Sequence, residues 1–156
     1  MSTSTQSSVR TRMATRVTPY LRFDGNCAEA MKFYKDCFGG DLNVMTVAES
    51  QMAGKLPGVD SKRIFHASLT SGSIELLGSD MVPDGLTRGN STALALQCAG
   101  EQELRTYFSK LSAGGKVNYP VDKAIWGGLY GQLVDQFGVE WMLNFMPESA
   151  SGPSRS

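Results

Sequence analysis

Apolar and polar residues follow one order twice along the chain. In the first copy, residues 17–23 alternate as a strand does, and a turn at Asp24-Gly25 leads into a helix that ends at Gly39-Gly40. Asn26 and Glu29 have the spacing of a capping box at the start of that helix. The helix itself is predicted from apolar residues that recur at intervals of three and four, namely Ala30, Phe33, Tyr34, Cys37 and Phe38.

The second copy repeats this pattern about 74 positions later. A strand at 92–98 precedes a helix that ends at Gly114-Gly115. Further strands are predicted at 41–48, 63–70 and 73–79 in the first copy, and near 116–120, 129–134 and 139–145 in the second. The predicted fold class is therefore α+β: two βαβββ modules that form a curved mixed sheet with the helices outside. Its concave face is the expected ligand pocket.

Turn-rich residues at 81–91 separate the two copies. The predicted organisation is a first module at 16–80, this connector, and a second module at 92–146. Residues 1–15 are too poor in large apolar side chains to fold alone and are predicted to be a disordered tail, and 147–156 are a second tail. The irregular stretch 49–62 is a long loop of the kind that forms lids, partner contacts or mobile segments.

Charge and cysteine content narrow the class of protein. The 15 Lys and Arg residues balance 15 Asp and Glu residues, so no bulk charge attracts nucleic acid or an anionic membrane. The chain has no run of about 18 apolar residues, the length that a membrane helix needs. Three cysteines without CxxC spacing argue against a disulfide framework or a structural zinc site and indicate a reducing compartment. We therefore expect a cytoplasmic protein with neither nucleic-acid nor membrane partners.

Three local patterns carry a resemblance to a known family. They are residues 20–30 (YLRFDGNCAEA) with Phe33-Tyr34 and 38–40 (FGG), residues 66–69 (HASL) ahead of the strand at 74–80, and residues 126–127 (WG) with 135–141 (DQFGVEW). In order and spacing they resemble the vicinal oxygen chelate superfamily, which includes glyoxalase I, bleomycin-resistance proteins and extradiol dioxygenases, and more narrowly its PhnB-like branch. The resemblance implies a glyoxalase-like fold, a small-molecule ligand, and a homodimer that completes or covers the pockets.

The resemblance also implies a divalent metal, held in metal-using members by four ligands, mostly His and Glu, from the first and last strands of the modules. Glu75 lies where a ligand glutamate is expected, and His66 is the single histidine of the chain. The other expected places hold Thr18 or Tyr20, Thr92 and Met142, which are poor ligands or none. The ligand set of Glu75 and His66 is incomplete, so the cofactor stays undecided. The branch also carries a demethylubiquinone methyltransferase label, although no glycine-rich cofactor loop follows a strand here.

Two sets of side chains are candidates for the site. His66 and Glu75 form an acid/base or ligand pair if both turn inward; in the alternative, His66 is a hydrogen-bonded strand residue and Glu75 faces solvent. An aromatic pocket for a planar or cationic ligand is predicted from Tyr20, Trp126, Tyr130 and Trp141. In the alternative, Trp141 belongs to the core and Trp126 packs against a loop. Asp135 is predicted to be a turn residue.

Three functions follow from these features. One is a metal-assisted enzyme of the lyase, isomerase or oxygenase class that acts on a small oxygenated substrate through His66 and Glu75. Another is a non-catalytic protein of the bleomycin-resistance type that binds or sequesters a small ligand through its aromatic residues. In the third, the pocket is vestigial and the homodimer itself is the functional object. The sequence does not decide whether the protein is an enzyme.

Overall fold

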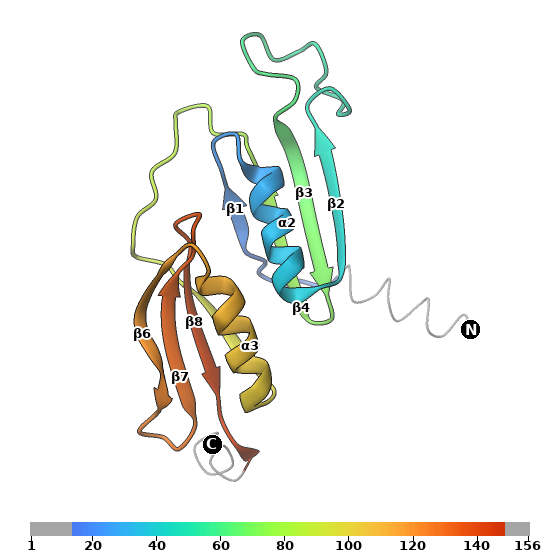
Figure 1. The fold of residues 1–156 in the computed structure, drawn as a ribbon. Coiled ribbons are helices and arrows are strands. Elements are labelled where there is room, and N and C mark those ends of the chain that lie inside the picture. The colour runs from blue at the N-terminus through green and yellow to red at the C-terminus, as the bar shows by residue number, and fades with distance from the viewer. Residues whose placement is uncertain (1–13, 149–156) are drawn as a thin grey trace, which may run out of the picture.

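The structure, a computed structural model, describes residues 14–148, so most of both predicted tails lies outside the described residues (Figure 1). The elements follow the predicted order twice. The first module contains β1 (Tyr20–Arg22), α2 (Cys27–Phe38), β2 (Asp41–Thr46), β3 (Ile64–Ser71) and β4 (Ile74–Ser79). The second contains β5 (Leu94–Cys98), α3 (Glu101–Ser112), β6 (Lys116–Lys123), β7 (Leu129–Val134) and β8 (Glu140–Phe145). The predicted α+β class with two βαβββ modules is confirmed.

The strands form two four-stranded mixed sheets with the same topology. Their orders are β1-β4-β3-β2 and β5-β8-β7-β6, and in each sheet the first strand of the module runs parallel to the last strand. Among the described residues, no strand of one sheet is hydrogen-bonded to a strand of the other. Strand β6 extends beyond the predicted 116–120. Its register shifts on both sides of Tyr119, and this irregular edge strand accommodates Pro120.

Helix α2 begins differently from the sequence prediction. The expected capping box at Asn26 does not form, since the Asn26 side chain makes no capping hydrogen bond. Instead, the carboxylate of Asp80, at the end of β4, accepts a hydrogen bond from the Cys27 N–H at 3.0 Å. The helix ends as predicted at Gly39, whose φ of 74° lies in the left-handed region that glycine adopts without strain.

The two modules meet through α2, which contacts both α3 and β8 of the second module. The ring of Phe38 on α2 lies 5.1 Å from Tyr107 on α3 and 5.6 Å from Trp141 on β8. Trp141 and Leu143 belong to the face of the second sheet that also carries α3. The helix-bearing faces of both sheets therefore turn toward the module boundary, and the other two faces, called here the uncovered faces, turn away from it.

Asp135 fixes this arrangement from inside the core. Its Oδ1 accepts the N–H groups of Phe137 and Val139 at 2.8 and 3.1 Å, which closes the β7–β8 turn as predicted. Its Oδ2 accepts the Tyr34 hydroxyl of α2 at 2.6 Å and the Trp141 indole N–H at 2.9 Å. Burial, followed by the charge of Asp135, raises the pKa of Tyr34, so the tyrosine holds its proton. One buried carboxylate thus links both modules.

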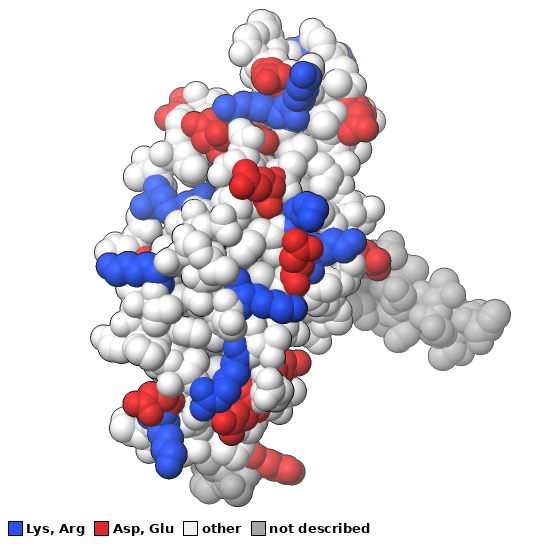
Figure 2. All heavy atoms as spheres, in the orientation of Figure 1, with Lys and Arg blue, Asp and Glu red and all other residues white. Residues whose placement is uncertain are grey.

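Basic and acidic side chains are intermingled on the face of the molecule that Figure 2 shows. This mixture matches the equal numbers of basic and acidic residues in the chain. Within residues 14–148, neither helix has the length and apolar character required to cross a membrane.

Candidate functional site

The first uncovered face carries Tyr20, His66 and Glu75. His66 on β3 is exposed, and its ring lies 6.1 Å from the ring of Tyr20 on β1. Glu75 on β4 is paired with Thr70, four residues further along β3 than His66. At about 3.3 Å per residue, this places the two candidate acid/base residues roughly 13 Å apart along the strands. They share a face, but only a ligand long enough to span that distance reaches both.

Neither residue has the neighbours that a metal site requires. Glu75 forms an ion pair with Arg16 at 2.9 Å, and His66 neighbours an aromatic ring. Across residues 14–148, no three His, Cys, Asp or Glu side chains converge in a way that could hold a metal ion. A divalent metal needs three or four such donors. The described residues therefore do not fit the metal site that the resemblance implies.

The second uncovered face presents a fixed aromatic and amide surface. The Trp126 ring contacts Tyr130 edge-on at 5.8 Å, and its indole N–H donates to Asn144 Oδ1 at 3.2 Å. Asn144 in turn donates through Nδ2 to Gln97 Oε1 at 2.9 Å. Because Asn144 accepts with its oxygen and donates with its nitrogen, the orientation of its amide is determined. Trp126, Tyr130, Asn144 and Gln97 together are called here the aromatic–amide patch.

Trp141 does not belong to this patch. Only 3% of its surface is exposed, and its indole N–H is bound to Asp135. It packs against Tyr34 and Phe38 of α2 in the interior, as the core alternative predicted. Of the four candidate aromatic residues, Tyr20 therefore lies on the uncovered face of the first module, and Trp126 and Tyr130 on that of the second.

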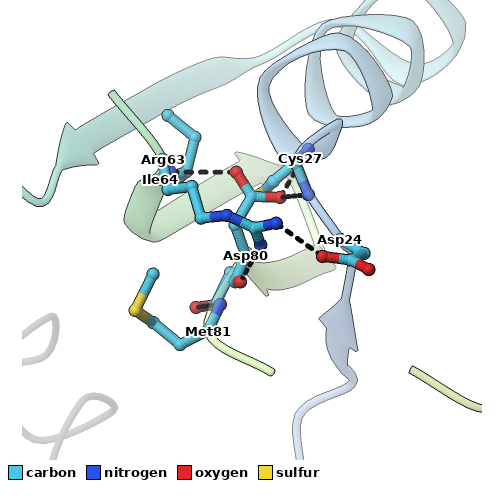
Figure 3. Close-up of polar contacts among 8 residues, drawn as sticks. Asp24, Cys27, Arg63, Ile64, Asp80 and Met81 are labelled. Atoms are coloured by element: carbon cyan, nitrogen blue, oxygen red, sulfur yellow. Dashed lines mark hydrogen bonds and ion pairs between the residues drawn. The ribbon is translucent and has the colours of Figure 1, made fainter. Parts of the chain in front are cut away.

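A second group of polar residues, which the sequence did not reveal, lies at the N-terminal end of α2 (Figure 3). Asp80 is 1% exposed, and its carboxylate accepts the N–H groups of Gly25, Cys27 and Ile64 at 2.8 to 3.0 Å. It thereby ties the end of β4 to the helix start and to the start of β3. Its partners lie up to 55 residues away in the chain, so no local sequence signal identifies them.

Arg63 connects this group to the surface. Its Nη1 donates to the Asp80 carbonyl oxygen at 2.8 Å, and its Nη2 pairs with the Asp24 carboxylate at 2.6 Å (Figure 3). The three residues form one edge of a cavity of about 720 Å³. The long loop predicted at 49–62 supplies a wall of this cavity through Met52, Leu56 and Val59.

All three cysteines are free and buried. Burial raises the pKa of Cys27 to about 12, with a smaller contribution from the charge of Asp80, and burial raises those of Cys37 and Cys98 to about 11. These thiols stay protonated near neutral pH and are poor nucleophiles. Cys37 serves as the small apolar helix residue that its position predicted.

The two βαβββ modules, each with its own four-stranded mixed sheet, have the glyoxalase-like fold that the sequence resemblance implied. A sequence model of the family described as 3-demethylubiquinone-9 3-methyltransferase matches residues 15–144. The chain belongs to this family, and the PhnB-like resemblance is confirmed.

Solved structures agree with this assignment. Protein PA1353 from Pseudomonas aeruginosa is 32% identical and superimposes with a TM-score of 0.75 over 85% of this chain and 98% of its own. The PhnB protein from Bacillus cereus is 28% identical, with a TM-score of 0.68 over 85% of this chain and 100% of its own. A glyoxalase-related enzyme from Fulvimarina pelagi, 22% identical with a TM-score of 0.56 over 86% of this chain and 90% of its own, shares the fold alone.

Proposed function

We propose that this protein binds a small planar or cationic molecule without catalysing its conversion, and that a homodimer completes the site. The observation that carries the proposal is the aromatic–amide patch. Trp126 is 43% exposed, yet its indole is fixed by the hydrogen bond to Asn144. A flat apolar ring that is already oriented binds another flat ring with little loss of conformational entropy.

The polar groups beside the indole support the same function. The bond from Asn144 to Gln97 extends the fixed surface across β8 to β5. Gln132 donates to the Tyr130 hydroxyl, which fixes a second ring beside Trp126. These neutral groups suit recognition of hydrogen-bonding edges on a ligand. A metal-assisted reaction would instead need donors that the described residues do not bring together.

The direction of the uncovered faces supports the proposed homodimer. Within one chain the helices pack between the modules, so the faces with Tyr20 and Trp126 do not enclose a common pocket. Strands β1 and β5 are each paired on one side only, which leaves an edge on each sheet where a second chain can lie. A second copy that places its first sheet against this second sheet would convert two open faces into one pocket.

The test uses proflavine, a planar cation, as the probe, and follows its fluorescence polarisation. We expect Trp126→Ala to weaken binding by roughly 5- to 30-fold, the size of a lost stacking or cation–π contact. Ile125→Ala is the matched control, because Ile125 is the adjacent, fully exposed residue and should leave affinity unchanged. Equal affinity of the wild type and Trp126→Ala, or a monomer at all concentrations in light scattering after gel filtration, would contradict the proposal.

A further inference from the structure

We infer that the cavity at the start of α2 is a separate binding site for a neutral or cationic aromatic molecule. This goes beyond the function proposed above, because its lining includes no residue of the aromatic–amide patch and none of Tyr20, His66 and Glu75. Its volume of about 720 Å³ lies within the range of roughly 300–1,000 Å³ usual for small-molecule pockets.

The cavity lies at the end of the first sheet where β4 ends and α2 and β3 begin. Phe65 on β3 lines it, at the register shift between β2 and β3 where the neighbouring Ile64 belongs to the core. The other walls are the loop between β2 and β3, residues 47–63, and the first residues of the connector, at 81–83. The lining includes none of Tyr20, His66 and Glu75, the candidate residues of the first uncovered face.

Most of the wall is apolar and adaptable. Its apolar members are Met52, Leu56, Val59, Phe65, Met81 and Val82. Two thioethers and a phenyl ring on different walls suit an aromatic guest, because methionine sulfur makes favourable contacts with ring edges and its side chain adjusts to the guest's shape. The wall chemistry therefore selects an aromatic body over a polar one.

The wall is also held in shape. The loop is closed by backbone hydrogen bonds from Val47 N to Arg63 O at 2.9 Å and from Ala48 N to Ser61 O at 3.0 Å. Ser50 reinforces the turn, because its hydroxyl donates to Val47 O at 2.8 Å and accepts the Met52 N–H at 3.0 Å. On the opposite side, the three backbone hydrogen bonds of Asp80 fix the ends of β4 and β3. Hydrogen bonds within the first module therefore maintain the shape of the cavity.

The charged side chains of the lining determine which charge the polar group of the ligand can carry. Asp24, Asp60 and Asp80 line the cavity together with a single cation, Arg63. Arg63 is already engaged by Asp24 and by the Asp80 carbonyl, so an added anion meets two further carboxylates and no second basic side chain in the lining. Like charges disfavour that anion, whereas a cation or a neutral amide is favoured beside Asp24 and Asp60.

Three probes of nearly equal shape separate these cases: 2-naphthamidine, 2-naphthamide and 2-naphthoate. Calorimetric titration of the full chain should show the amidine binding at least tenfold more tightly than the carboxylate, with the neutral amide between them. Val59→Trp, which fills the cavity, should abolish this binding. Val117→Trp is the matched control: Val117 is similarly exposed, at 42% against 36% for Val59, but lies on β6 of the other module and should leave binding unchanged.

A charge variant tests the polar end independently. Asp60→Asn should reduce the preference for 2-naphthamidine over 2-naphthoate, whereas Asp122→Asn should not, although both carboxylates accept a nearby backbone N–H. The inference is overturned if no probe binds, if Val59→Trp binds as the wild type does, or if 2-naphthoate binds as tightly as 2-naphthamidine. It is also overturned if Val59→Trp changes the oligomeric state, because the cavity would then be an interface between copies. Trp126→Ala should leave all three affinities unchanged, which keeps this test apart from that of the proposed function.

Discussion

Tyr34→Phe should destabilise the protein more than any other removal of a single tyrosine hydroxyl. The hydroxyl donates to Asp135 at 2.6 Å inside the core and links α2 of the first module to the β7–β8 turn of the second. A hydrogen bond to a charged group contributes about 1.5–3 kcal/mol. Because Trp141 and two backbone groups still bind the carboxylate after the change, we expect a loss of about 2 kcal/mol.

Urea unfolding followed by circular dichroism and tryptophan fluorescence measures this loss, which corresponds to a fall in Tm of roughly 4–8 °C for a domain of this size. Tyr107→Phe is the control: Tyr107 contacts Phe38 across the same boundary, and among residues 14–148 its hydroxyl makes no hydrogen bond. It should lose less than about 0.5 kcal/mol. Equal losses in the two variants, or a Tyr34→Phe protein as stable as the wild type, would refute the role assigned to Asp135.

Three further changes test other parts of the structure. Asp80→Ala leaves three backbone N–H groups without their acceptor and should lose about 4 kcal/mol or more in urea unfolding, with Asp80→Asn intermediate. Gly131→Ala places a Cβ 2.7 Å from the Phe108 ring and should lose about 1–3 kcal/mol, whereas Gly89→Ala meets nothing within 4 Å and should not. The thiol of Cys27 has its pKa raised to about 12, so the unfolded chain releases this proton first and stability falls as the pH rises from about 9 to 12. Cys27→Ala should reduce that alkaline slope by about 1.4 kcal/mol per pH unit, and an unchanged slope would contradict the assignment.

The helices and hairpins could be predicted because their signals are local. Apolar residues at helical spacing predicted α2 and α3, and the glycine pairs after them predicted where they end. The turn around Gly72 likewise predicted the β3–β4 hairpin. Each of these features depends on residues within a few positions of one another.

The way in which the modules meet could not be predicted, because it depends on contacts across the chain. The link from Tyr34 to Asp135 joins residues 101 positions apart, and the same Asp135 also forms an ordinary turn that its own sequence explains. The helix cap at Cys27 comes from Asp80, whereas the nearby Asn26 and Glu29 have the expected spacing and make no cap. Trp141 is an aromatic residue of the kind that lines pockets, and its sequence position did not reveal that it packs in the core against Tyr34 on α2 of the other module.

The two buried aspartates explain why the candidate binding residues lie where they do. Asp80 and Asp135 are both satisfied by N–H or O–H donors, so each fixes structure and neither is available to a ligand. Asp135 holds the helices between the sheets, and this packing turns Tyr20 and Trp126 outward on separate faces. Asp80 holds the N-terminal end of α2 against β3 and β4, which leaves the cavity beside Arg63 open to the 47–63 loop. The same packing that buries the core in one chain therefore leaves the aromatic–amide patch open.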